Sequence, residues 1–101
     1  MAYRRVFVGT FQGDRNLEFE RSFFEETIVP AMRIRGALSV EMVQTDNNQF
    51  VATATYPDEN TADANPDGIR ALRKNIIETF NLDTMDAYGG TTTVIWEIGR
   101  S

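Results

Sequence analysis

Chemistry in this chain depends on a restricted set of side chains, because the 101-residue sequence contains no histidine and no cysteine. Without imidazoles and thiolates, the usual ligands for zinc, copper and iron–sulfur clusters are missing. Cysteine nucleophiles, serine–histidine pairs and a histidine haem ligand are excluded for the same reason, and no glycine-rich dinucleotide fingerprint follows an expected strand. We therefore expect no cofactor and no metal, so that acid–base chemistry must use Tyr, Lys, Arg, Asp or Glu with a shifted pKa.

Tyr56 is the candidate catalytic residue. It ends an alternating stretch, residues 49–56, and is followed by Pro57. A tyrosine hydroxyl in an apolar pocket can donate a hydrogen bond or exchange a proton. The same position also suits a half-buried tyrosine with a hydrated hydroxyl, which is a common arrangement, so both interpretations stay open.

Trp96 and Phe24 are the candidate substrate-binding residues. Trp96 is the only tryptophan and alternates with Val94 and Ile98 in a β-prone stretch. Its indole offers a flat wall for an aromatic ligand, although such a residue more often belongs to a core. Phe24 lies on the apolar stripe of a predicted helix and would line the same pocket as Tyr56. Strand alternation does not say whether Trp96 faces the helices or a partner's sheet.

The elements that position these residues follow the order β-α-β-β-α-β. Period-two patterns predict strands and 3.6-residue patterns predict helices. Pro30 is expected to end or kink the first helix, and residues 81–88 are expected to form a connection. The strands are expected at residues 3–11, 37–45, 49–56 and 91–98, and the helices at residues 16–29 and 66–80.

This order is that of the ferredoxin-like fold. We expect one α+β domain over residues 1–101, with a four-stranded antiparallel sheet, central first and third strands, and two helices on one face. Each predicted strand carries apolar side chains on both faces, whereas the helices can cover only one. A second copy of the chain is the simplest cover for the other face, which predicts a homodimer through the sheet face.

Charge and hydropathy exclude several other partners. The formal net charge of −5 disfavours a nucleic-acid role, and the apolar stretches are far shorter than the roughly 20 residues that span a bilayer. Arg4-Arg5 is similar to part of a twin-arginine export signal, but Gly9-Thr10 interrupts the apolar run that such a signal needs. We expect a cytoplasmic protein.

The stretch from Gly36 to Ala62 is similar to a known family. Gly36-Ala37-Leu38-Ser39-Val40-Glu41 matches a pattern of glycine, serine or threonine, then glutamate at the second strand; Asp46, Phe50 and Tyr56-Pro57-Asp58-Glu59 continue it. In these residues the chain resembles the dimeric α+β barrel superfamily, in its antibiotic-biosynthesis-monooxygenase-like branch. Two positions depart from the family, with Arg35 in place of its usual proline and Asn65 near the place of a frequent histidine.

The resemblance implies a cofactor-independent monooxygenase-like enzyme, or an isomerase, acting on a small hydrophobic or aromatic molecule. Tyr56 stands at the family's aromatic position, where its hydroxyl would hydrogen-bond to a phenolic substrate or exchange a proton with it. Such an enzyme would hold its substrate in a dry, apolar cavity and stabilise the substrate anion with a few polar groups. The missing histidine keeps an alternative open, which is a non-catalytic ligand-binding or regulatory homodimer of the same fold. Glu41, at the family's glutamate position, is expected to have a structural role, for example an ion pair with Arg5.

Overall fold

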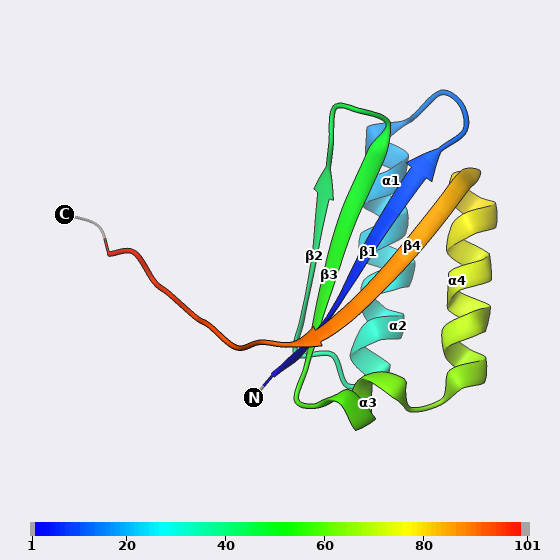
Figure 1. Cartoon of the computed structure of the whole chain (residues 1–101). Coiled ribbons are helices and arrows are strands. Elements are labelled where there is room, and N and C mark those ends of the chain that lie inside the picture. The colour runs from blue at the N-terminus through cyan, green and yellow to red at the C-terminus, as the bar shows by residue number, and fades with distance from the viewer. Residues whose placement is uncertain (1, 100–101) are drawn as a thin grey trace.

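The computed structural model, which describes residues 2–99, is built on one four-stranded antiparallel sheet (Figure 1). The strand order is β2-β3-β1-β4, so the predicted central positions of the first and third strands are confirmed. The strands are β1 (Tyr3–Phe11), β2 (Ser39–Gln44), β3 (Gln49–Tyr56) and β4 (Leu82–Thr91). The helices are α1 (Leu17–Phe23), α2 (Val29–Ile34), α3 (Glu59–Asp63) and α4 (Pro66–Phe80), and a π-helical turn, η1 (Phe24–Ile28), joins α1 to α2.

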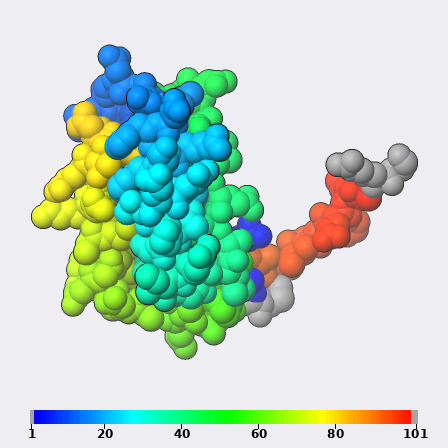
Figure 2. Space-filling view, turned by 180° about the vertical axis from the view of Figure 1, so that it is seen from behind, coloured from blue at the N-terminus to red at the C-terminus, as the bar shows by residue number. Residues whose placement is uncertain are grey.

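The two long helical segments lie on one face of the sheet, as predicted. Figure 1 shows α1–α2 and α4 behind the strands, and Figure 2, seen from behind, shows the same helices covering the sheet. The α+β ferredoxin-like fold expected from the order of elements is therefore confirmed. No helix within residues 2–99 is long and apolar enough to cross a membrane.

Strand β3 shows how the sheet divides its side chains between two faces. Phe50, Ala52, Ala54 and Tyr56 point toward the helices, and each is exposed by 6% or less. The residues between them point to the opposite face and are only half-buried. Alternation with period two thus produces a helix-covered inner face and an outer face that no helix covers.

The first helical segment passes Pro30 instead of ending before it, so the expectation that Pro30 ends the helix was wrong, whereas the regular α-helix is interrupted just before Pro30 by η1. The η1 turn explains the difference. The Val29 N–H donates to the Phe24 carbonyl, five residues earlier, which is the wider π-helical spacing. Pro30 then falls in the first turn of α2, where its missing N–H leaves no hydrogen bond broken. The helix ends at Ile34 with Arg35 as its cap, and Gly36 follows in the left-handed region with φ of +93°.

The prediction of the last strand at residues 91–98 was also wrong. Strand β4 runs from Leu82 to Thr91, through most of the segment expected to be a connection. Asn81 caps α4 in the left-handed region, with φ of 53°, so the chain turns directly into the strand. Gly89 in β4 leaves room for the Tyr3 side chain of β1, because a Cβ at Gly89 would lie 2.3 Å from the Tyr3 hydroxyl.

The residues after Thr91 leave the body of the protein. The Thr92 N–H donates to the Ala2 carbonyl at 2.8 Å, and residues 92–99 carry no regular secondary structure. Figure 1 shows this segment extending away from the sheet. We call residues 92–99 the C-terminal arm.

Candidate active site

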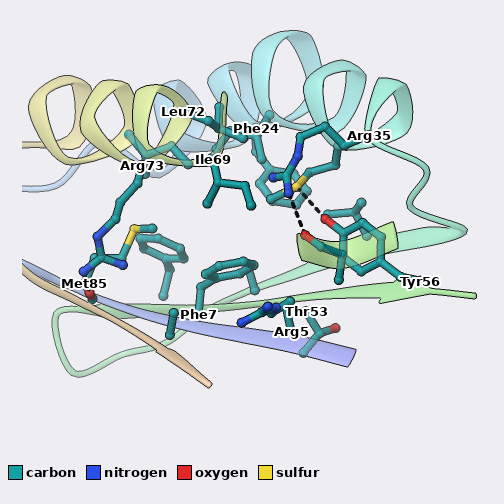
Figure 3. A pocket seen from close by; sticks show the side chains of 18 residues that line it. Arg5, Phe7, Phe24, Arg35, Thr53, Tyr56, Ile69, Leu72, Arg73 and Met85 are labelled. Carbon is teal, nitrogen blue, oxygen red and sulfur yellow. Dashed lines mark hydrogen bonds between the residues drawn. The ribbon is translucent and has the colours of Figure 1, made fainter. Parts of the chain in front are cut away.

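A cavity of about 130 Å³ lies between the inner face of the sheet and the helices (Figure 3). Small side chains create this space: Ala52 of β3 and Ala87 of β4 flank Phe7 of β1 on the sheet side. The π-helical turn places Phe24 and Ile28 on the helical side. The remaining apolar lining comes from Met32, Val40, Phe50, Ala62, Ile69, Leu72, Ile76 and Met85.

Tyr56 ends β3 on the inner face and borders this cavity. Its side chain is among the most deeply buried in the described chain, with 1% exposed. The hydroxyl donates to the Met32 sulfur at 3.4 Å, and a thioether is a weak acceptor. Replacing this weak hydrogen bond with one to the oxygen of a ligand would therefore cost little free energy.

The surroundings of Tyr56 keep its hydroxyl protonated. Burial raises the pKa of the Tyr56 hydroxyl above its ordinary value, and the positive charges of Arg35 and Arg5 offset part of that rise. At neutral pH the group is a hydrogen-bond donor next to two cations. That combination suits the stabilisation of negative charge that develops on a bound molecule.

Three arginines contribute the strongly polar part of the lining. Arg35 follows α2, and its Nη2 donates to the Ala62 carbonyl at 2.9 Å. Arg5 of β1 forms an ion pair with Asp63 of α3. In Figure 3, Arg35 and Arg5 lie toward Tyr56, whereas Arg73 lies at the other end beside Met85.

The positive charges in the lining have no acidic counterpart within it, because no aspartate or glutamate of the described part of the chain borders the cavity. The Arg35 Nε is buried and has no hydrogen-bond partner among residues 2–99. Arg73, in contrast, donates to the Met85 backbone carbonyl. Within residues 2–99 no three aspartate or glutamate side chains gather as metal ligands.

The structure brings two of the three candidate residues together. Tyr56 and Phe24 both line the cavity, with Phe24 on the π-helical turn. Trp96 does not line it within one chain: it lies on the C-terminal arm and is 83% exposed. The separation follows from the end of β4 at Thr91, which leaves Trp96 outside the sheet.

Sequence reasoning missed the arginines. Arg5 was expected only in a structural ion pair, Arg35 was noted only as a departure from the family pattern, and Arg73 was not a candidate. A signal for Arg5 existed, because it shares the inward-facing parity of Phe7 along β1. Arg5 and Glu41 do not form the suggested ion pair across the sheet, since Arg5 pairs with Asp63 and Glu41 is exposed; a role of Glu41 at a dimer interface stays a prediction.

Comparison with known proteins identifies relatives by fold and not by sequence. No family model matches the sequence, and no curated protein matches it. Two solved structures with related folds are oxygenases from Streptomyces. The monooxygenase from the ActVA-Orf6 gene of Streptomyces coelicolor, in complex with nanaomycin D, has a TM-score of 0.72 and 16% identity over 97% of this chain and 93% of its own. SnoaB, a cofactor-independent oxygenase from Streptomyces nogalater, has a TM-score of 0.60 and 16% identity over 93% of this chain and 95% of its own.

A third solved structure is a dimeric ferredoxin-like protein from an uncultured marine organism. It has a TM-score of 0.64 and 17% identity, covering 99% of this chain and 93% of its own. At such identities the likeness is one of fold. The chain therefore has the fold of dimeric ferredoxin-like and antibiotic-biosynthesis-monooxygenase-like proteins, as the resemblance in its sequence implied.

Proposed function

We propose that this chain is a cofactor-independent monooxygenase-like enzyme that acts on a small aromatic molecule in the cavity between sheet and helices. The observation that carries the proposal is the Tyr56 hydroxyl, which is buried on the cavity wall and has only the Met32 sulfur as partner. Phe24 provides part of the apolar wall. The fold relatives that are named as oxygenases support the same class of reaction.

The reaction proposed here needs no electrons from a cofactor, because the substrate supplies them. A hydroquinone and O₂ give a hydroxyquinone and water: one oxygen atom replaces a ring hydrogen as hydroxyl, and the other leaves as water with two hydrogens. One hydroxyl of the hydroquinone must first lose its proton to solvent, so the negative charge that develops on that oxygen needs stabilisation. Tyr56 would donate a hydrogen bond to that oxygen, and the nearby arginines would favour the anion electrostatically.

Oxygen consumption tests this proposal. We expect the protein to accelerate O₂ uptake by hydroquinone in buffer that contains a metal chelator, after subtraction of the uncatalysed rate. Tyr56→Phe should lower kcat by about 100-fold or more, the usual contribution of a positioned proton donor, while changing KM little. Ser22→Ala is the control, because it also removes one hydroxyl and Ser22 is exposed on α1, away from the cavity and the outer face, and it should keep the wild-type rate. Uptake equal to the uncatalysed rate, or a Tyr56→Phe enzyme with wild-type kcat, would contradict the proposal.

The alternative function is a ligand-binding or regulatory homodimer without catalysis. It is favoured by the absence of histidine from the chain, which removes the commonest general base. The same experiment separates the two functions. Binding of an aromatic ligand in the cavity without O₂ uptake would support the alternative.

We also propose a homodimer that forms through the outer face of the sheet. On this face Val51 lies directly between Val8 of β1 and Val43 of β2 in the strand register. Val43 is 58% exposed and Tyr88, at the other side of the face, is 60% exposed. A contact between two such faces would bury on the order of 1,000 Å² or more, enough for a stable interface.

The C-terminal arm supplies a second argument for the dimer. Val94, Ile95, Trp96 and Ile98 are each between 75% and 88% exposed. An extended segment with this much apolar surface is suited to lying on a partner subunit. Contact between Trp96 and the substrate, as predicted, would then depend on the assembly.

Light scattering tests the dimer at micromolar concentration. We expect twice the chain mass of 11.4 kDa, and a monomer mass would contradict the proposal. A cytoplasmic location and the absence of nucleic-acid binding stay predictions.

A further inference from the structure

We propose that the ligand of the cavity is a single-ring aromatic carboxylate, whose carboxylate is held by Arg35 at the end of the cavity that contains Tyr56. This inference rests on the proposed function in one respect only, namely that the cavity is the ligand site. It adds the size of the ligand, its charge and the residue that recognises that charge.

The charge of the lining argues for a negatively charged ligand. The protein as a whole is acidic, with a net charge of −5. Its cavity has the opposite character, because Arg5, Arg35 and Arg73 border it and no carboxylate does. A cavity that served only to bind neutral apolar molecules would gain nothing from partly desolvated guanidinium groups.

Arg35 is the arginine whose hydrogen bonds are left incomplete. The Asp63 carboxylate pairs with Arg5, and the Met85 carbonyl accepts from Arg73. The Arg35 Nε is buried without a partner, although its Nη2 is fixed by the Ala62 carbonyl. A buried donor without a partner is costly, and a ligand oxygen would satisfy it.

The chemistry of guanidinium selects a carboxylate among possible anions. Its N–H groups form a planar fork that matches the two oxygens of a carboxylate. The Tyr56 hydroxyl, whose only partner is the Met32 sulfur, lies toward the same end of the cavity (Figure 3). A carboxylate held by Arg35 would therefore lie beside Tyr56, and the single hydroxyl proton of Tyr56 would remain for a ring oxygen of the same ligand.

The volume of the cavity limits the ligand to one ring. At about 130 Å³, the cavity is close to the roughly 150 Å³ apolar cavity that accepts benzene in an engineered protein. Phe7, Phe24 and Phe50 supply aromatic walls that pack well against a ring. Polycyclic molecules would need the surrounding side chains to move.

Binding calorimetry with a charged and a neutral probe of the same shape tests the inference on the full-length protein. Benzoate and nitrobenzene are both planar single rings, but only benzoate carries a net charge. We expect wild-type protein to bind benzoate at least about tenfold more tightly than nitrobenzene, as a charge-assisted hydrogen bond implies. Arg35→Met should abolish that preference and leave nitrobenzene affinity within about twofold.

Arg33→Met is the matched control, because Arg33 lies on the same helix, is exposed, and loses the same charge when replaced. It should keep the wild-type preference for benzoate. Equal affinity of the wild type for the two probes would overturn the carboxylate inference while leaving the cavity as a ligand site. Binding of neither probe would overturn both the inference and the proposed site. If Arg35→Met does not fold, the affinities of the wild-type protein for benzoate and nitrobenzene still test whether the cavity prefers a carboxylate.

Discussion

The two faces of one sheet differ in what covers them. On the inner face, the helices bury Phe50 and Tyr56 almost completely, and a small cavity lined by arginines remains beneath them. On the outer face, Val43 and Tyr88 are more than half exposed, and the apolar residues on this side are fewer: in β3 only Val51 is apolar, between Gln49 and two threonines. The same period-two pattern therefore produces a ligand site where helices supply the cover and, we propose, a subunit interface where another chain supplies it.

The contrast shows that apolar alternation alone does not define a core. A face becomes a core only where the chain returns a second layer to it. Here Phe24 and Ile76 come from the two helical segments and complete the inner layer, while the C-terminal arm leaves the molecule instead of packing on the outer face. The following changes test whether the two faces differ as described.

The largest effect is expected for Phe50→Ala on the inner face. The Phe50 ring is 2% exposed and lies edge-on against the rings of Phe11 and Phe80 at 5.9 and 5.7 Å. Its removal should lower the free energy of unfolding by about 3–5 kcal/mol. Urea denaturation measures this loss, and Val51→Ala, its neighbour on the outer face, should lose less. Equal losses for the two variants would show that the faces are equivalent.

An intermediate effect is expected for Val51→Asp at the centre of the outer face. A carboxylate placed between Val8 and Val43 would be buried without a partner in the proposed dimer. The dimer dissociation constant should rise at least about tenfold, which is about 1.4 kcal/mol.

Sedimentation or light scattering across a dilution series measures that change. Ser22→Asp, on the exposed side of α1, adds the same charge and should leave the dimer intact. If Val51→Asp associates as tightly as the wild type, the outer face is not the interface.

The smallest effect concerns the pH dependence of stability at Tyr56. Because burial raises the pKa of Tyr56 in the folded state above its ordinary value of 10.0, the folded chain holds this proton more tightly than the unfolded chain does. The resulting contribution to stability is complete below about pH 10 and is lost as the pH rises through the folded-state pKa. The free energy of unfolding of the wild type should therefore fall relative to that of Tyr56→Phe above pH 10. Denaturation at pH 9 and above measures the difference, and a difference that stays constant would contradict a raised pKa.

Local sequence signals predicted the parts of the fold that depend on local rules. Alternation placed β3 at residues 49–56, and Asn65-Pro66 together with the apolar stripe placed α4 at residues 66–80. The strand order followed from the order of elements. Two predictions failed because the outcome depends on contacts that local patterns do not show. The position of β4 is set by its pairing with β1. The helix continues past Pro30 because a π-helical turn changes the hydrogen-bond spacing just before it.

The site was only half predictable for a related reason. Tyr56 and Phe24 belong to regular elements whose period fixes the direction of the side chain. Arg35 lies just after a helix, where its direction depends on the turn at Gly36 and on the Ala62 carbonyl of a distant segment. The periodicity of the sequence does not indicate the direction of the Arg35 side chain.

The difference between the faces is tested most directly by methyl NMR of the protein during titration with a single-ring aromatic probe, benzoate or nitrobenzene. Ile28, Met32 and Met85 report on the cavity, and Val6, Val43 and Val51 report on the outer face. We predict saturable shifts of the three cavity methyl signals with no change in the three outer-face signals. Shifts confined to the outer-face valines, or no saturable shift at the cavity, would contradict the assignment of the inner face as the ligand site.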